Sequence, residues 1–76
     1  MIDLSWGAER AWHFLAGTAG QYREPLLCAG APVPYGAAPA FELATPLAGP
    51  GTVEPAGTGA WRLWMSDGWV ALERAH

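Results

Sequence analysis

The strongest structural signal in this chain reads AWRLWMSDGWVALE and covers residues 60–73. Two runs of strand-forming residues flank the dipeptide Asp67-Gly68. Such a dipeptide is among the clearest hairpin signals in a sequence, because a type I′ turn needs a positive φ at both of its central residues. The sequence therefore predicts a β-hairpin at residues 60–74 with Asp67 and Gly68 as its two-residue loop.

Side chains alternate between the two faces of a strand, so this loop assigns every hairpin residue to a face. The first face carries Trp61, Leu63, Met65, Val70, Leu72 and Arg74, and the second carries Arg62, Trp64, Ser66, Trp69, Ala71 and Glu73. The first face is almost entirely apolar and is expected to face the core. Arg62 would lie opposite Glu73 as a cross-strand ion pair, and Arg74 opposite Trp61 as a cation–π contact. A register slip of one residue would exchange the faces.

Chain length and cysteine content limit how the fold can be stabilised. A chain of 76 residues is one domain at most, and a core this small rarely supplies more than about 3–5 kcal/mol. Cys28 is the one cysteine, so an internal disulfide is excluded. Cys28, His13 and His76 lack the paired spacing of a structural zinc site. We therefore expect no metal and no cofactor, and a fold completed either by its own small core or by a partner.

Charge and composition exclude several classes of partner. The formal net charge is −3 and all four basic residues are arginine, which argues against nucleic acid as the main partner. No stretch approaches the roughly 20 apolar residues of a membrane span. The first residues lack the basic segment of a signal peptide, which together with the lone cysteine favours synthesis in the cytoplasm. Five tryptophans are too many for a disordered chain.

The N-terminal third is predicted to contain a helix at residues 8–16. These residues are good helix formers, and Gly17 stands where a C-terminal capping glycine is common. Asp3 or Ser5 could cap the helix N-terminus. One helical face would collect the residues Leu4, Ala8, Ala11, Trp12 and Leu15.

Residues 30–58 read as an extended arm rich in proline and glycine. Within it, only residues 41–45 alternate well enough to form a strand, and residues 52–54 are a second, very short candidate. Its scattered apolar residues suit an extended strap on another surface, either the chain's own hairpin or a neighbouring chain.

The predicted fold class is α+β in a single domain spanning residues 1–76. Residues 1–29 would provide the helix and an extended segment, 30–58 the arm, and 60–74 the hairpin. The alternative is an all-β mini-sheet in which residues 2–6, 10–16 and 22–28 are strands.

The sequence contains no catalytic motif. His13 lies in the predicted helix four residues after Glu9, with no nucleophile nearby, and is read as a surface histidine. Cys28 has no basic neighbour to lower its pKa and is read as a buried apolar side chain. The acidic residues are dispersed and are expected to be solvated. We therefore expect the protein not to be an enzyme.

Trp64 and Trp69 are the best functional candidates, because both fall on the second hairpin face next to Arg62. Tryptophan and arginine are enriched among residues that dominate protein–protein binding. Tyr35 and Phe41 of the arm complete the predicted partner-binding set. The competing interpretation is that other parts of the chain cover both tryptophans.

These features predict a non-catalytic structural or adaptor protein. It would dock into a larger assembly, such as a virion or another multi-subunit particle, through the aromatic hairpin and the arm. Its partners would be other protein subunits in a homo- or hetero-oligomer, with no nucleic acid and no membrane. The alternatives are a small carbohydrate- or cell-wall-binding module that uses a tryptophan platform, and a soluble protein inhibitor.

Overall fold

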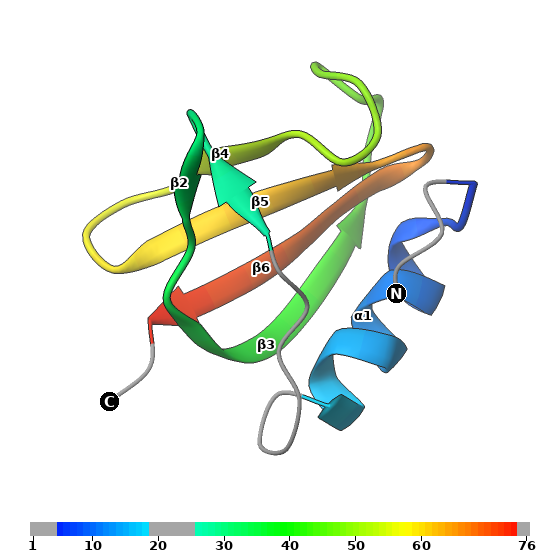
Figure 1. The fold of residues 1–76 in the computed structure, drawn as a ribbon. Helices are drawn as coiled ribbons and strands as arrows, with labels where there is room; N and C mark the ends of the chain where they lie inside the picture. Colours follow the sequence, from blue (N-terminus) through cyan, green and yellow to red (C-terminus); the bar gives the residue numbers. More distant parts are fainter. Residues whose placement is uncertain (1–4, 19–25, 75–76) are drawn as a thin grey trace.

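The computed structural model describes residues 5–18 and 26–74 (Figure 1). Within these residues the fold is a small single mixed α+β domain with one helix and two sheets. The elements are α1 (Ala8–Thr18), β1 (Leu27–Cys28), β2 (Ala31–Pro32), β3 (Tyr35–Leu43), β4 (Val53–Pro55), β5 (Ala60–Met65) and β6 (Gly68–Arg74). The α+β prediction is confirmed at this level. The all-β alternative is wrong, because residues 10–16 lie inside α1.

The main sheet has four antiparallel strands in the order β3-β6-β5-β4. The hairpin β5–β6 forms its centre, and β3 and β4 form its two edges. The two short strands β1 and β2 pair with each other in a separate ribbon. Figure 1 shows α1 alongside the β3 side of the sheet. A sheet covered by one helix has one face in the core and one face turned outward.

The hairpin forms where the sequence predicts it, but its turn lies one residue earlier. Trp64 pairs with Trp69 and Met65 pairs with Gly68, which leaves Ser66 and Asp67 as the loop. The predicted type I′ turn is wrong, because neither loop residue has a positive φ. Gly68 instead begins β6.

Close packing against β3 explains why position 68 is a glycine. A Cβ atom there would overlap the carbonyl oxygen of Glu42 and come within 2.9 Å of the Cα of Leu43. Glycine is the residue that allows two backbones to approach this closely. Glycine at position 68, which the sequence analysis explained by the turn, is therefore explained by the close packing of β6 against β3.

Moving the turn by one residue shifts the strand register by two. A shift of two keeps each side chain on its predicted face, because the side-chain period of a strand is two. It does change the cross-strand partners. Arg62 lies opposite Ala71, and Trp61 lies opposite Leu72. The predicted pairs of Arg62 with Glu73 and of Trp61 with Arg74 are therefore wrong.

The arm at residues 30–58 supplies both edge strands of the sheet and so lies along the chain's own hairpin. The strand predicted at residues 41–45 is part of the longer β3, and the one at 52–54 corresponds to β4. Pro39 lies within β3, where the register with β6 shifts between Ala37 and Ala40. Proline is tolerated there because β3 is an edge strand and the pairing is irregular.

Helix α1 begins at the hairpin turn. The Oδ1 atom of Asp67 accepts a hydrogen bond of 2.7 Å from the backbone N–H of Ala8. A carboxylate at a helix N-terminus satisfies a free N–H and interacts favourably with the helix dipole. Of the two caps predicted from sequence, Asp3 lies outside the described residues, and Ser5 lies three residues before Ala8, where α1 begins. The helix also continues through Gly17, so the predicted stop at that glycine is wrong.

The core lies between α1 and the inner face of the sheet. The predicted helical face is confirmed at Ala8, Ala11 and Leu15, which are fully buried, while Leu4 lies outside the described residues. The sheet contributes its first predicted face to the same cluster. The buried cluster consists of Ala8, Ala11, Leu15, Val33, Tyr35, Ala38, Val53, Leu63, Met65, Val70 and Leu72. The described part of the chain has no helix that could span a membrane.

Candidate functional site

The outer face of the sheet is the candidate functional site. Its membership follows from the strand register, because residues opposite one another on neighbouring strands project from the same face. One row runs from Glu42 on β3 through Trp69 on β6 to Trp64 on β5, and the next runs through Ala40, Ala71, Arg62 and Glu54. Glu73 lies two residues beyond Ala71 on the same face. We call these eight residues the outer face.

Arg62 and Trp69 form the best-defined contact of the outer face. The guanidinium carbon of Arg62 lies 4.9 Å from the centre of the Trp69 ring, in the range of a cation–π contact. The same guanidinium lies 3.7 Å from a carboxylate oxygen of Glu54 on β4. The Arg62 and Glu54 side chains remain 43% and 40% exposed. Trp69 is half-buried, and the Arg62 guanidinium lies over its ring.

The structure buries or turns inward the other predicted partner-binding residues. Trp64 is directly opposite Trp69, but only 3% of it is exposed. Tyr35 is fully buried in the core. Phe41 projects toward the helix, where its ring centre lies 5.2 Å from that of Trp12. The predicted platform of two exposed tryptophans is therefore reduced to Trp69 with Arg62, because Trp64 is interior.

Trp64 is buried beside the connection between β3 and β4. Residues 44–52 join the two edges of the sheet and so pass the turn end of the hairpin (Figure 1). Ala44 donates a backbone hydrogen bond to Asp67, and Gly51 donates one of 2.7 Å to Trp64. The indole Nε1 of Trp64 is buried and has no hydrogen-bond acceptor among the described residues. An unsatisfied buried donor of this kind costs about 1–3 kcal/mol.

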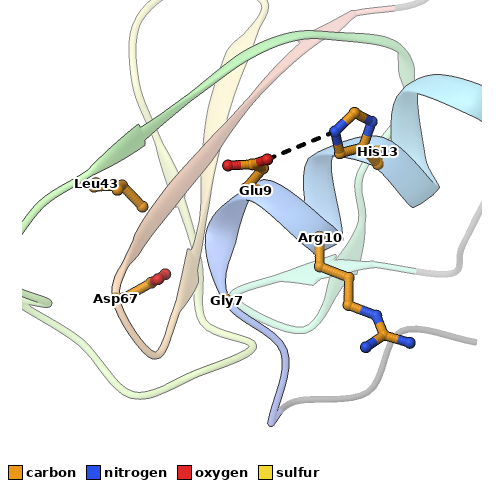
Figure 2. A pocket seen from close by; sticks show the side chains of 6 residues that line it. All are labelled: Gly7, Glu9, Arg10, His13, Leu43 and Asp67. Carbon is orange, nitrogen blue, oxygen red and sulfur yellow. Dashed lines mark ion pairs between the residues drawn. The ribbon is translucent and has the colours of Figure 1, made fainter.

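A second feature is an open depression of about 380 Å³ where the start of α1 meets the sheet (Figure 2). Its lining residues are Gly7, Glu9, Arg10, His13, Leu43 and Asp67. His13 Nε2 lies 3.9 Å from Glu9 Oε1, and both side chains are about two-thirds exposed. Figure 2 shows Arg10 pointing away from the other labelled side chains. Asp67 is already used as the helix cap.

The depression offers little chemistry. A histidine next to a glutamate could serve as a general base, but the six lining residues include no serine, threonine, cysteine or lysine to act as a nucleophile. Cys28 is half-buried in β1 and packs against the core. Among the described residues, no group of three or more histidine, cysteine, aspartate or glutamate side chains could hold a metal ion.

Comparison with protein-family models, with curated proteins and with solved structures found no match for this chain. The site must therefore be interpreted from its own residues.

Sequence analysis placed five members of the outer face correctly, Arg62, Trp64, Trp69, Ala71 and Glu73, and missed the other three. Ala40, Glu42 and Glu54 were assigned to an arm without a fixed register, so no face could be given to them. Ala71 was placed on the correct face, but alanine carries no chemical signal of binding. The alternation of residues 40–43, read as one strand of the sheet, would have placed Ala40 and Glu42 on one face.

Proposed function

We propose that this protein is a non-catalytic structural or adaptor protein that binds another protein through the outer face of its sheet. The observation that carries the proposal is the Trp69–Arg62 contact beside the small side chains of Ala40 and Ala71. Tryptophan and arginine at the centre of a patch are typical of residues that dominate protein–protein binding. A shallow apolar area with a charged rim is the usual composition of such an interface.

Two exposed leucines lie at or just beyond the end of β3: Leu43 is 60% exposed and Leu47 is 86% exposed. Leu43 alternates with Glu42 and therefore projects from the opposite face of the sheet, where it lines the depression beside α1. Leu43 therefore does not extend the outer face.

The carbohydrate-binding alternative has less support. Sugar binding on a tryptophan platform requires an open ring face, and the guanidinium of Arg62 already lies over the Trp69 ring. Trp64, the second tryptophan of the predicted platform, is buried. A partner that inserts side chains next to Trp69 needs neither of these ring faces to be open.

The assembly proposal includes a virion or another multi-subunit particle as the larger complex, with synthesis in the cytoplasm. The support is indirect: a sheet face on which the described helix does not pack, and the absence of catalytic groupings among the described side chains. A homo- or hetero-oligomeric subunit would use the same face.

The test is capture of partner proteins from the native source by the purified full chain and two matched variants. Ala40→Glu places a large charged side chain on the outer face, while Ala31→Glu makes the same change at an exposed strand residue of β2. Each captured protein is identified by mass spectrometry and its binding is confirmed with purified components.

The expected result is a protein that binds the wild-type chain and Ala31→Glu but is lost with Ala40→Glu. Equal binding by all three chains would contradict the outer face as the docking surface. Binding of a purified polysaccharide, with no protein partner, would favour the carbohydrate-binding alternative.

A further inference from the structure

The outer face contains two opposite alanines with short side chains, and we call this pair the floor. Ala40 on β3 and Ala71 on β6 lie directly opposite one another. Directly opposite residues in an antiparallel pair have Cβ atoms about 4.5–5.5 Å apart. Since neither side chain extends beyond its Cβ atom, the floor is lower than the row of Glu42 and Trp69. On its other side, Glu73 stands between Ala37 and Ala60.

Carboxylates stand at two sides of this floor. Glu42 follows Ala40 by two residues on β3, and Glu73 follows Ala71 by two residues on β6. Because the two strands are antiparallel, the two carboxylates lie at opposite ends of the floor. Both residues are exposed. Among the described residues neither one forms an ion pair, whereas Glu54 is paired with Arg62.

The remaining sides of the floor are aromatic and cationic. Trp69 lies beside Ala71 in the row that contains Glu42, and Arg62 lies opposite Ala71 on β5. Arg62 is already held by Trp69 and Glu54. The outer face therefore carries three carboxylates and one guanidinium, and within residues 5–18 and 26–74 two of its carboxylates are not paired with a cation.

We propose that the floor binds an arginine side chain of the partner protein, an inference that rests on the proposed docking function. The guanidinium would lie over Ala40 and Ala71, donate hydrogen bonds to Glu42 and Glu73, and contact the edge of Trp69. Arginine fits better than lysine, because its planar group pairs with carboxylates in a fixed geometry and packs against aromatic rings.

The chain already contains two contacts between an arginine and a tryptophan ring. Arg62 lies 4.9 Å from the Trp69 ring centre, and Arg10 lies 4.9 Å from the ring centre of Trp6 near the helix. A partner arginine at the floor would add a second cation beside Arg62, with the carboxylates of Glu42 and Glu73 to balance its charge. Because the site is exposed, added salt should screen its charges and lower its affinity for the arginine. The Debye length is about 8 Å at physiological ionic strength.

The test uses the ¹⁵N-labelled full chain and two short peptides, acetyl-Gly-Gly-Arg-Gly-Gly-amide and the same peptide with citrulline in place of arginine. Citrulline keeps the shape of arginine but has no charge. Chemical shifts are followed at low salt for the wild-type chain, Glu42→Gln and Glu73→Gln. Glu9→Gln is the control, because Glu9 is an exposed glutamate on α1.

The expected result is that the arginine peptide shifts the amide signals of Ala40, Glu42 and Ala71 and the indole signal of Trp69. The citrulline peptide should bind more weakly, and each of Glu42→Gln and Glu73→Gln should weaken arginine binding by about two- to fivefold, as expected for an exposed ion pair. Glu9→Gln should bind as the wild type does.

Equal binding of the two peptides, no shift at the floor, or a shift confined to the depression near Glu9 would each overturn the proposal. The proposed function can survive that failure. If Ala40→Glu still abolishes capture of a partner protein, the outer face docks a partner by other contacts. If Ala40→Glu has no effect either, both proposals fail.

Discussion

The two faces of the β5–β6 hairpin use the same strands for different purposes. The inner face places Leu63, Met65, Val70 and Leu72 in the core, all 0–1% exposed. The outer face carries Trp69, half-buried, with charged residues and alanines around it. The inner side chains are all apolar and act through their volume, while the outer side chains differ in chemistry and are the ones that we propose for recognition. This difference separates the residues that fold the chain from those that we propose bind a partner.

The largest expected effect is the loss of stability when a side chain of the inner face is removed. Leu72→Ala removes a side chain with no exposed surface, and such a change costs about 2–5 kcal/mol. The whole domain is expected to have a stability of similar size. Urea denaturation followed by tryptophan fluorescence should find this variant partly or fully unfolded at room temperature. If this variant is as stable as the wild type, Leu72 does not belong to the core.

The second-largest loss of stability is expected where β3 lies close to the hairpin. Gly68→Ala puts a methyl group against the Glu42 carbonyl, and inserting atoms into a packed site costs about 1–3 kcal/mol. Gly17→Ala is the control, because a Cβ there meets no atom within 4 Å. Thermal unfolding should show a lower midpoint for Gly68→Ala and an unchanged or higher one for Gly17→Ala. Equal midpoints would contradict the close approach of the strands.

A smaller effect is expected at the contact between the hairpin turn and the helix. Asp67→Ala removes the hydrogen-bond acceptor for Ala8 N–H, and losing such a cap costs about 1 kcal/mol. Asp67→Asn keeps an acceptor and should lose only the charge interaction with the helix dipole, about 0.3–1 kcal/mol. Urea unfolding of both variants measures the two contributions. If Asn and Ala are equally destabilising, the hydrogen bond contributes nothing.

The smallest expected effect compares two tryptophans. Trp12 Nε1 donates a hydrogen bond of 2.9 Å to the Ala38 carbonyl, whereas Trp64 Nε1 has no acceptor among the described residues. Both Trp→Phe changes remove ring volume, and Trp12→Phe should cost about 1 kcal/mol more because it also loses the hydrogen bond. Trp64→Phe removes an unsatisfied donor, which offsets the loss of ring volume, and should change the unfolding free energy little. A larger loss for Trp64→Phe would mean that its N–H is satisfied in solution.

The sequence was enough to predict the helix, the hairpin and the apolar face of each. These predictions depend on side-chain periodicity, which a register error of two residues leaves unchanged. The turn type and cross-strand partners were predicted wrongly, because Gly68 is required by contact with β3 rather than by φ. That contact joins positions 42 and 68, and no local pattern in the sequence reports it.

The candidate site was predictable only where a residue carried its own chemical signal. Trp69 and Arg62 were identified because tryptophan and arginine are common in interfaces. Ala40 and Glu42 become meaningful once β3 is aligned with β6, and that alignment spans nearly 30 residues of sequence with an irregularity at Pro39. The burial of Trp64 likewise depends on the path of the connection between β3 and β4.

The measurement that tests the division between the two faces most directly is the unfolding free energy of Ala40→Glu, determined by urea denaturation beside Leu72→Ala. Because Ala40 is exposed on the outer face, we predict a change within about 0.5 kcal/mol of the wild type, as for most surface substitutions. A loss as large as that of Leu72→Ala would contradict this account, because it would mean that the outer face is part of the folded core and is not free for a partner.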